Sequence, residues 1–159
     1  MRGVPIVLGL CLLATHGAVA QERPVDPYTI SNANAGAKPV TDPALLVAFH
    51  GSVGIGRIVD DLVARSVVDP RLAEIFHASD LDRLRRTLKE QISYILGAGI
   101  DYSGRDMKTT HKDQGINTTE FNILVELLQL SMDKEGVAFS AQNKLLHKLA
   151  PMKTDVVTR

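Results

Sequence analysis

One short segment, residues 102–116, reads YSGRDMKTTHKDQGI and governs how the rest of the chain is interpreted. Met107 and His111 are four residues apart, a spacing that puts two side chains on one face of a helix. Gly115 is a typical helix stop, so the pattern predicts a short helix with a histidine near its end. Imidazole is a good ligand for iron, but a histidine at a helix end is also a common capping or surface residue. The segment alone leaves both interpretations open.

The sequence on either side predicts two longer amphipathic helices. Apolar residues recur at spacings of three and four over residues 81–95, and Gly97-Ala98-Gly99 ends that pattern. Asn117 and Glu120 resemble a capping box ahead of an apolar face over residues 121–132. A helical bundle can hold a flat apolar molecule between two such faces. The side chains expected to face each other are Leu84, Leu88 and Ile92 on one side and Met107 and His111 on the other.

The remaining apolar residues also follow a helical period. They fall in residues 45–49, 55–67 and 72–76. Asp69-Pro70 is expected to end the second of these helices, since the residue before a proline disfavours helical geometry. Ser140 is expected to cap a last helix, which Pro151 interrupts or kinks. Because no segment alternates as a strand would, we predict one all-α domain over residues 42–159.

Several of these segments resemble one known family. Tyr102–His111 is similar to the Tyr-x-Gly-x-x-Met-Lys-x-x-His segment of the group I truncated haemoglobins, and Gly115-Ile116 and Phe121 continue the similarity. The resemblance extends from Leu45 to Pro151, which includes Asp69-Pro70. It implies a two-over-two helical sandwich around haem b, which reversibly binds the diatomic gases oxygen, NO and CO.

The resemblance also implies roles for particular residues. His111 would be the proximal ligand of the haem iron, Phe76 would pack on the distal face, and Tyr102 would lie near a propionate. The complete set of expected haem contacts is His111, Phe76, Leu84, Leu88, Tyr102, Met107, Ile116, Phe121 and Leu124. Without haem, the apolar members of this set would simply be core residues.

The chain departs from the family where a bound gas would be held. Val63 occupies the position of a tyrosine, and Leu88 that of a glutamine, which often donate hydrogen bonds in the family. We therefore expect a largely apolar distal pocket that binds CO and NO readily and retains dioxygen poorly, because a hydrogen bond to a charged group contributes roughly 1.5–3 kcal/mol. Gln91 is a possible replacement donor and His77 a possible sixth ligand, although both are also typical surface residues.

Basic residues cluster on the helix expected before the short one. Arg83, Arg85, Arg86 and Lys89 could pair with haem propionates or could form a solvated helix face. Two other functions also remain open at this stage. One is a haem enzyme that dioxygenates nitric oxide or reduces peroxide with a periplasmic electron-transfer partner, and the other is a haem-free helical interaction module.

The N-terminal residues predict export. Arg2, an apolar run over residues 4–13 and Ala18-Val19-Ala20 together form a signal-peptide pattern over residues 1–20. The run is too short for a comfortable membrane span, so no stable membrane insertion is expected after cleavage. Residues 21–41 lack periodicity and predict a flexible leader, and the mature chain is expected in the periplasm.

Composition excludes some classes of partner and chemistry. Lys and Arg number 18, as do Asp and Glu, so the formal net charge is zero and no nucleic-acid partner is expected. The only cysteine, Cys11, lies in the predicted signal peptide. Disulfide and thiolate chemistry is therefore not expected in the mature domain.

Overall fold

The computed structural model describes residues 22–159, so the predicted signal peptide over residues 1–20 lies outside the described residues. Within residues 22–159 every regular element is helical, which confirms the predicted all-α class. The elements are η1 (Asn32–Ala35), α1 (Pro43–Ala48), α2 (Gly51–Val68), α3 (Ala73–His77), α4 (Leu81–Ile95), α5 (Met107–His111), α6 (Thr118–Glu135), α7 (Phe139–Leu149), η2 (Ala150–Met152) and α8 (Lys153–Val156).

Local signals in the sequence set most helix ends. Asp80 caps α4 by accepting a hydrogen bond from the Arg83 backbone N–H at 3.1 Å. Asn117 and Glu120 form the predicted capping box of α6, with both reciprocal hydrogen bonds present. The cap of α7 differs from the prediction: the helix begins at Phe139, one residue before Ser140, and no side chain caps it.

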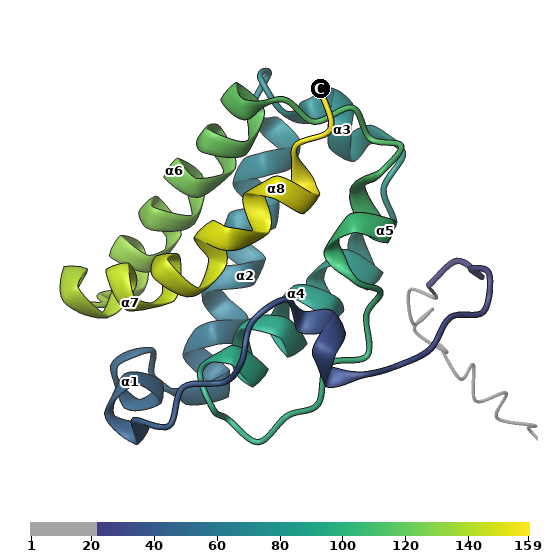
Figure 1. Ribbon diagram of the computed structural model, residues 1–159. Helices are drawn as coiled ribbons and strands as arrows, with labels where there is room; N and C mark the ends of the chain where they lie inside the picture. The colour runs from purple at the N-terminus through teal and green to yellow at the C-terminus, as the bar shows by residue number, and fades with distance from the viewer. Residues whose placement is uncertain (1–21) are drawn as a thin grey trace, which may run out of the picture.

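The core lies where α2 packs against both α4 and α6 (Figure 1). Because the chain has no tryptophan and few aromatic residues, this core is mainly aliphatic. Its fully buried members include Ile55, Ile58, Val59, Ile95 and Leu145. The short helices α3 and α5 lie at one end of the molecule, where α8 also packs against α5.

The segment before α1 lies on the domain. Ala35 is completely buried at the end of η1, and its carbonyl accepts a hydrogen bond from the Gln91 side chain at 2.9 Å. The Val40 backbone N–H donates to the carbonyl of Ile95 at 2.8 Å. Residues 22–41, which the sequence predicts to be a flexible leader, therefore contact the helices through both backbone and side-chain groups. The predicted domain boundary at Asp42 remains a prediction.

Candidate functional site

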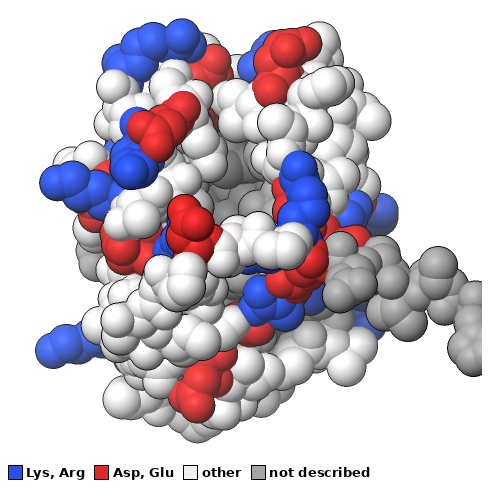
Figure 2. Space-filling model, turned by 90° about the vertical axis from the view of Figure 1, so that its right-hand side faces the viewer, with Lys and Arg blue, Asp and Glu red and all other residues white. Residues whose placement is uncertain are grey.

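An apolar cavity lies between α2, α3 and α4 on one side and α5, α6 and α8 on the other. It contains about 790 Å³ of space between atoms, including the part open to solvent. Figure 2 shows that the face of the molecule on the right of Figure 1 is hollowed, with charged side chains around the hollow. The residues that line the cavity are Leu62, Val63, Ser66, Leu72, Ile75, Phe76, Ser79, Leu84, Leu88, Thr110, His111, Gln114, Ile116, Glu120, Phe121, Leu124 and Val156.

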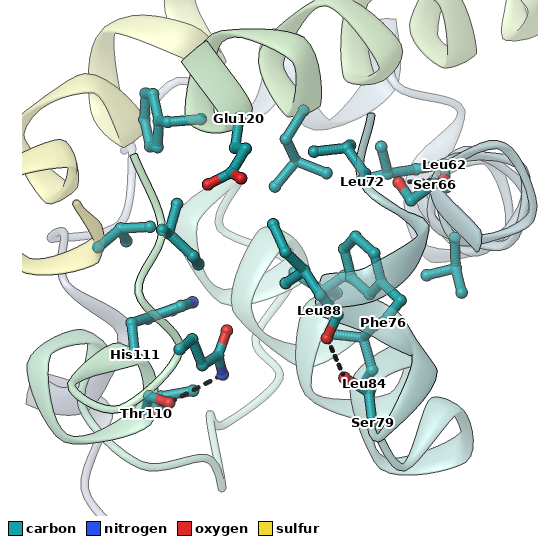
Figure 3. A pocket seen from close by; sticks show the side chains of 17 residues that line it. Leu62, Ser66, Leu72, Phe76, Ser79, Leu84, Leu88, Thr110, His111 and Glu120 are labelled. Carbon is teal, nitrogen blue, oxygen red and sulfur yellow. Dashed lines mark hydrogen bonds between the residues drawn. The ribbon is translucent and has the colours of Figure 1, made fainter. Parts of the chain in front are cut away.

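His111 is the one imidazole in this lining. Its side chain lies between α5 and the cavity, opposite Phe76 and Leu88 (Figure 3). Nδ1 is 2.7 Å from the backbone carbonyl of Met107, one helical turn earlier. Since a carbonyl only accepts, Nδ1 carries the proton, and Nε2 keeps its lone pair. Metal-ligating histidines are commonly oriented by such a bond from the second ring nitrogen.

The position of His111 follows from how α5 is built. Asp106 caps this helix by accepting a hydrogen bond from the Thr109 backbone N–H at 2.9 Å. The five residues from Met107 to His111 form little more than one turn, which puts His111 at the end of α5 beside the cavity. Burial lowers the pKa of His111 from its ordinary value of 6.5, so the imidazole is neutral near pH 7, the state in which it can bind a metal.

The wall opposite His111 carries no free hydrogen-bond donor among the described residues. Leu84, Leu88 and Val63 present only alkyl groups to the cavity. Two hydroxyls are present, but both donate within their own chain segments: Ser66 to the Leu62 carbonyl at 2.8 Å and Ser79 to the Ile75 carbonyl at 3.3 Å. This wall of the cavity is therefore apolar, as the sequence predicted.

Seven of the nine predicted contact residues line the cavity, namely His111, Phe76, Leu84, Leu88, Ile116, Phe121 and Leu124. Tyr102 lines a neighbouring pocket together with Arg83 and Arg105, and Met107 packs against the core. The Tyr102 ring lies so close to Gly104 that a Cβ there would be 2.2 Å from the phenolic oxygen, which donates to the Arg105 carbonyl at 3.0 Å. Burial raises the pKa of Tyr102 to about 12, so the phenol stays protonated and remains a donor.

Met107 and Gln91 belong to the core beside the site. The Gln91 side-chain amide donates to the Ala35 carbonyl and also lies 3.4 Å from the Met107 sulfur. Gln91 is buried and outside the cavity lining, so it is neither the surface residue nor the distal donor considered from the sequence. His77, the possible sixth ligand, is exposed and also outside the lining.

A smaller polar pocket adjoins the apolar cavity, and Thr110 lines both. Its other lining residues are Val25, Tyr28, Arg83, Thr87, Tyr102, Gly104, Arg105 and Thr109. The Nε atoms of Arg83 and Arg105 are buried and have no hydrogen-bond partner among residues 22–159. A buried donor without a hydrogen bond is costly, but Arg83 Nε lies 3.8 Å from Asp80 Oδ2, so only Arg105 Nε has no acidic partner in this part of the chain. The two guanidinium groups that line this pocket make it suited to an anionic or carbonyl group.

Several residues that line the two pockets were not predicted from the sequence. Leu62 and Ile75 were predicted as apolar helix positions, and their period could have placed them on the cavity wall. Val156 follows the break at Pro151, and nothing in the local pattern indicates that it returns to the cavity. Tyr28 and Arg105 lie far apart in the sequence, and no local pattern brings them together.

All four members of the basic cluster on α4 are paired with acidic residues, and Arg83 lies 3.7 Å from Glu22 and 3.8 Å from Asp80. Lys89 lies 2.8 Å and Arg85 3.7 Å from Asp60 on α2, which joins the two helices. Arg86 binds both Glu22 and Glu90. The cluster is therefore a set of ion pairs rather than an open basic face, and Arg83 alone among the four reaches the polar pocket beside the cavity. Within residues 22–159, no helix has the length and apolarity needed to cross a membrane.

Comparison with known proteins defines the class of this fold. The structure of the Fe(III) form of truncated haemoglobin from Tetrahymena pyriformis superimposes with a TM-score of 0.69 at 18% identity, covering 72% of this chain and 98% of that chain. The 2/2 haemoglobin from Synechococcus sp. gives a TM-score of 0.66 at 19% identity with the same coverage. The described residues thus have the two-over-two fold of a truncated globin, as the sequence predicted.

The sequence comparisons agree with the fold. Residues 48–158 match the bacterial-like globin family, and the chain belongs to that family. A group 1 truncated haemoglobin from Chlamydomonas moewusii is 26% identical over 144 residues, which cover 87% of this chain and 84% of the relative.

Proposed function

We propose that this protein binds haem b with His111 as the proximal iron ligand and uses the opposite, apolar side of the site to bind diatomic gases. The observation that carries the proposal is the His111 imidazole, whose Nδ1 is occupied by the Met107 carbonyl while the ring borders an apolar cavity. Membership of the globin family and the similarity to truncated haemoglobins support it. Haem would supply an iron with a vacant coordination position for the gas.

The residues present fit the chemistry of haem at two places. A flat apolar macrocycle suits a cavity walled by Phe76, Leu88 and Phe121. At its edge haem carries two carboxylates, and the guanidinium groups of Arg83 and Arg105, which line the adjoining polar pocket, are suitable donors for them. The single cysteine, Cys11, lies in the predicted signal peptide, so haem b, which needs no thioether bond to the protein, is the form we propose.

The His111 side of the site and the side opposite it would have different roles. On one face the Met107 carbonyl orients the His111 ring and keeps its proton on Nδ1, so Nε2 keeps the lone pair that would bind iron. On the other face Val63, Leu84 and Leu88 exclude water and offer no donor to a polarised ligand. Such a site favours CO and NO, whose binding depends less on hydrogen bonding, over long retention of dioxygen.

An absorption spectrum tests the ligand assignment. The purified protein reconstituted with haemin and then reduced is expected to show a ferrous spectrum with an axial imidazole, which shifts when CO is added. H111A is expected to lose this imidazole signature and to regain it when free imidazole is supplied. H147A is the matched control, since His147 is exposed on α7 and lines neither pocket. An unchanged ferrous spectrum in H111A would refute the assignment of His111.

We also propose that the chain is exported and that cleavage follows Ala20 in the AVA sequence. Expression in a Gram-negative host followed by fractionation and intact-mass analysis tests this directly. A periplasmic species that begins at Gln21 supports the proposal, and a species that keeps residues 1–20 in every fraction contradicts it.

A further inference from the structure

The segment from Glu22 to Ala35, called the strap below, lies against the polar pocket beside the cavity. Val25 and Tyr28 of the strap line that pocket together with Arg83 of α4 and Arg105 of the following loop. The strap is the purple chain that approaches α4 and α5 in Figure 1. The polar end of the candidate site is therefore built from two parts of the chain that are more than fifty residues apart in sequence.

The strap binds both arginines of the pocket by backbone carbonyls. Arg105 donates from Nη2 to the Asp26 carbonyl at 2.7 Å, and its guanidinium lies 5.0 Å from the centre of the Tyr28 ring. Arg83 donates from Nη2 to the carbonyl of Arg23. In each arginine one terminal nitrogen is thus held by the strap, while Nε is buried without a hydrogen bond. Arg83 Nε lies 3.8 Å from the Asp80 carboxylate.

Side chains of the strap also attach it to the domain. The Glu22 carboxylate accepts a hydrogen bond from Arg86 at 2.8 Å, and the Tyr28 hydroxyl donates to the Ser103 carbonyl at 2.8 Å. Arg86 and Glu22 hold each other in their charged forms, since the ion pair lowers the pKa of Glu22. These contacts flank the two arginines, so the strap can orient the guanidinium groups before any ligand enters.

We propose that the strap holds Arg83 and Arg105 in place for the carboxylates at the edge of bound haem and thereby slows the loss of haem from the site. This inference rests on the proposed haem-binding function. A guanidinium is a planar fork, and fixing one part of it with a carbonyl sets the direction of the remaining donors. A donor oriented in advance loses less conformational entropy when the carboxylate binds, so the complex dissociates more slowly.

Tyr28 gives the cleanest test, because it contacts both Arg105 and the loop that carries it. Y28A removes the ring and the hydrogen bond, and it is expected to raise the rate of haemin transfer to an excess of an acceptor globin about ten-fold, which corresponds to roughly 1.4 kcal/mol. Y28F keeps the ring under Arg105 and is expected to change the rate much less. F139A is the matched control, since Phe139 is an exposed aromatic residue at the start of α7.

Haemin dimethyl ester separates the strap's action on carboxylates from simple coverage of the site. The ester lacks the charged oxygens that Arg83 and Arg105 would bind, so Y28A is expected to leave its rate of loss unchanged. A haemin transfer rate that Y28A does not alter, or an equal acceleration for haemin and its ester, overturns the inference. Failure of the unaltered protein to bind haemin overturns the proposed function instead.

Hydrogen exchange on the unaltered protein provides a test that needs no substitution. Amides of the strap are expected to exchange more slowly after haemin is added, because carboxylates bound to Arg83 and Arg105 would hold the strap's binding partners more firmly. Unchanged or faster exchange would mean that haem leaves the strap unaffected or displaces it, and either result overturns the inference.

Discussion

At the scale of single residues, Leu88 offers the sharpest test of how the apolar wall controls gas binding. Its side chain lines the cavity from α4, opposite the α5 side from which His111 comes. L88Q places an amide of similar size there, and a hydrogen bond to a polarised ligand contributes roughly 1.5–3 kcal/mol. We expect dioxygen dissociation to slow by about ten-fold to a hundred-fold and CO dissociation to change little, as stopped-flow measurements would show.

L88M is the matched control, because methionine has a similar volume and no donor. Its dioxygen dissociation rate is expected to stay near that of the unaltered protein. Equal slowing in L88M and L88Q would mean that packing, rather than hydrogen bonding, governs the escape of the ligand.

Two residues show where single-residue reasoning from the sequence stops. The glutamine at position 91 follows Leu88 by three residues, so the helical period places it near the cavity, yet its amide is drawn to the carbonyl of Ala35, which is fifty-six residues away in sequence. The helical period predicts only roughly which side of a helix a side chain faces. The exact orientation of the Gln91 side chain depends on a buried carbonyl that needs a hydrogen-bond donor. Tyr102 similarly turns to the Arg105 carbonyl because Gly104 leaves room for its ring.

At the scale of elements, Asp61 joins α2 to α6. Its carboxylate lies 2.6 Å from Lys134 Nζ and accepts a hydrogen bond from the Ser131 hydroxyl at 2.9 Å, while Arg65 on its own helix donates at 2.6 Å. Burial by itself would raise the pKa of Asp61, but the hydrogen bonds from Lys134, Arg65 and Ser131 outweigh it and lower the pKa to about 2. The folded protein therefore favours the ionised carboxylate.

This pKa shift predicts part of the acid sensitivity of the fold. A depressed pKa contributes stability above the unfolded value of 3.8, and that contribution is lost as the pH falls toward 2. D61N is expected to lower the free energy of unfolding by roughly 1–2 kcal/mol at neutral pH and to have a smaller effect near pH 2. D113N, at an exposed aspartate paired only with Lys112, is the control and should change little at either pH. Urea unfolding at both pH values measures the difference.

The capping box of α6 carries a second prediction at this scale. N117A removes the side-chain oxygen that accepts from the Glu120 backbone N–H at 2.9 Å, which is expected to cost about 1 kcal/mol of stability. N122A, four residues into the same helix and exposed, is the contrasting variant, since alanine favours a helix interior. Thermal unfolding should give a lower Tm for N117A than for N122A, and equal values would contradict the role of the cap.

The helices were predictable because their ends depend on residues close in sequence. Asp80, Pro70 and the pair of Asn117 with Glu120 each act within a single turn, and the apolar period between them identifies the buried face. The position of the strap was not predictable in the same way. Its contacts with Arg83 and Arg105 run through the backbone carbonyls of Arg23 and Asp26. Every residue type has the same backbone carbonyl, so the sequence carries no signal for these contacts.

At the scale of the whole molecule, the cavity divides the core between two groups of helices. The side of α2, α3 and α4 faces α5, α6 and α8 across a space that these residues leave unfilled, so the apolar lining makes fewer contacts than a packed core would. A molecule that fills this space and binds only the folded chain must stabilise the fold as a whole.

Haemin is therefore expected to raise the Tm of the protein. At a free concentration 100 times its Kd, a ligand contributes about 2.7 kcal/mol, and each kcal/mol raises the Tm of a domain of this size by roughly 4 °C, so the gain should be about 10 °C. H111A should show a clearly smaller gain at the same haemin concentration, because the apolar walls remain but the iron ligand is lost. No gain in the unaltered protein would favour a haem-free helical interaction module, whereas an equal gain in both proteins would mean that haemin binds without His111.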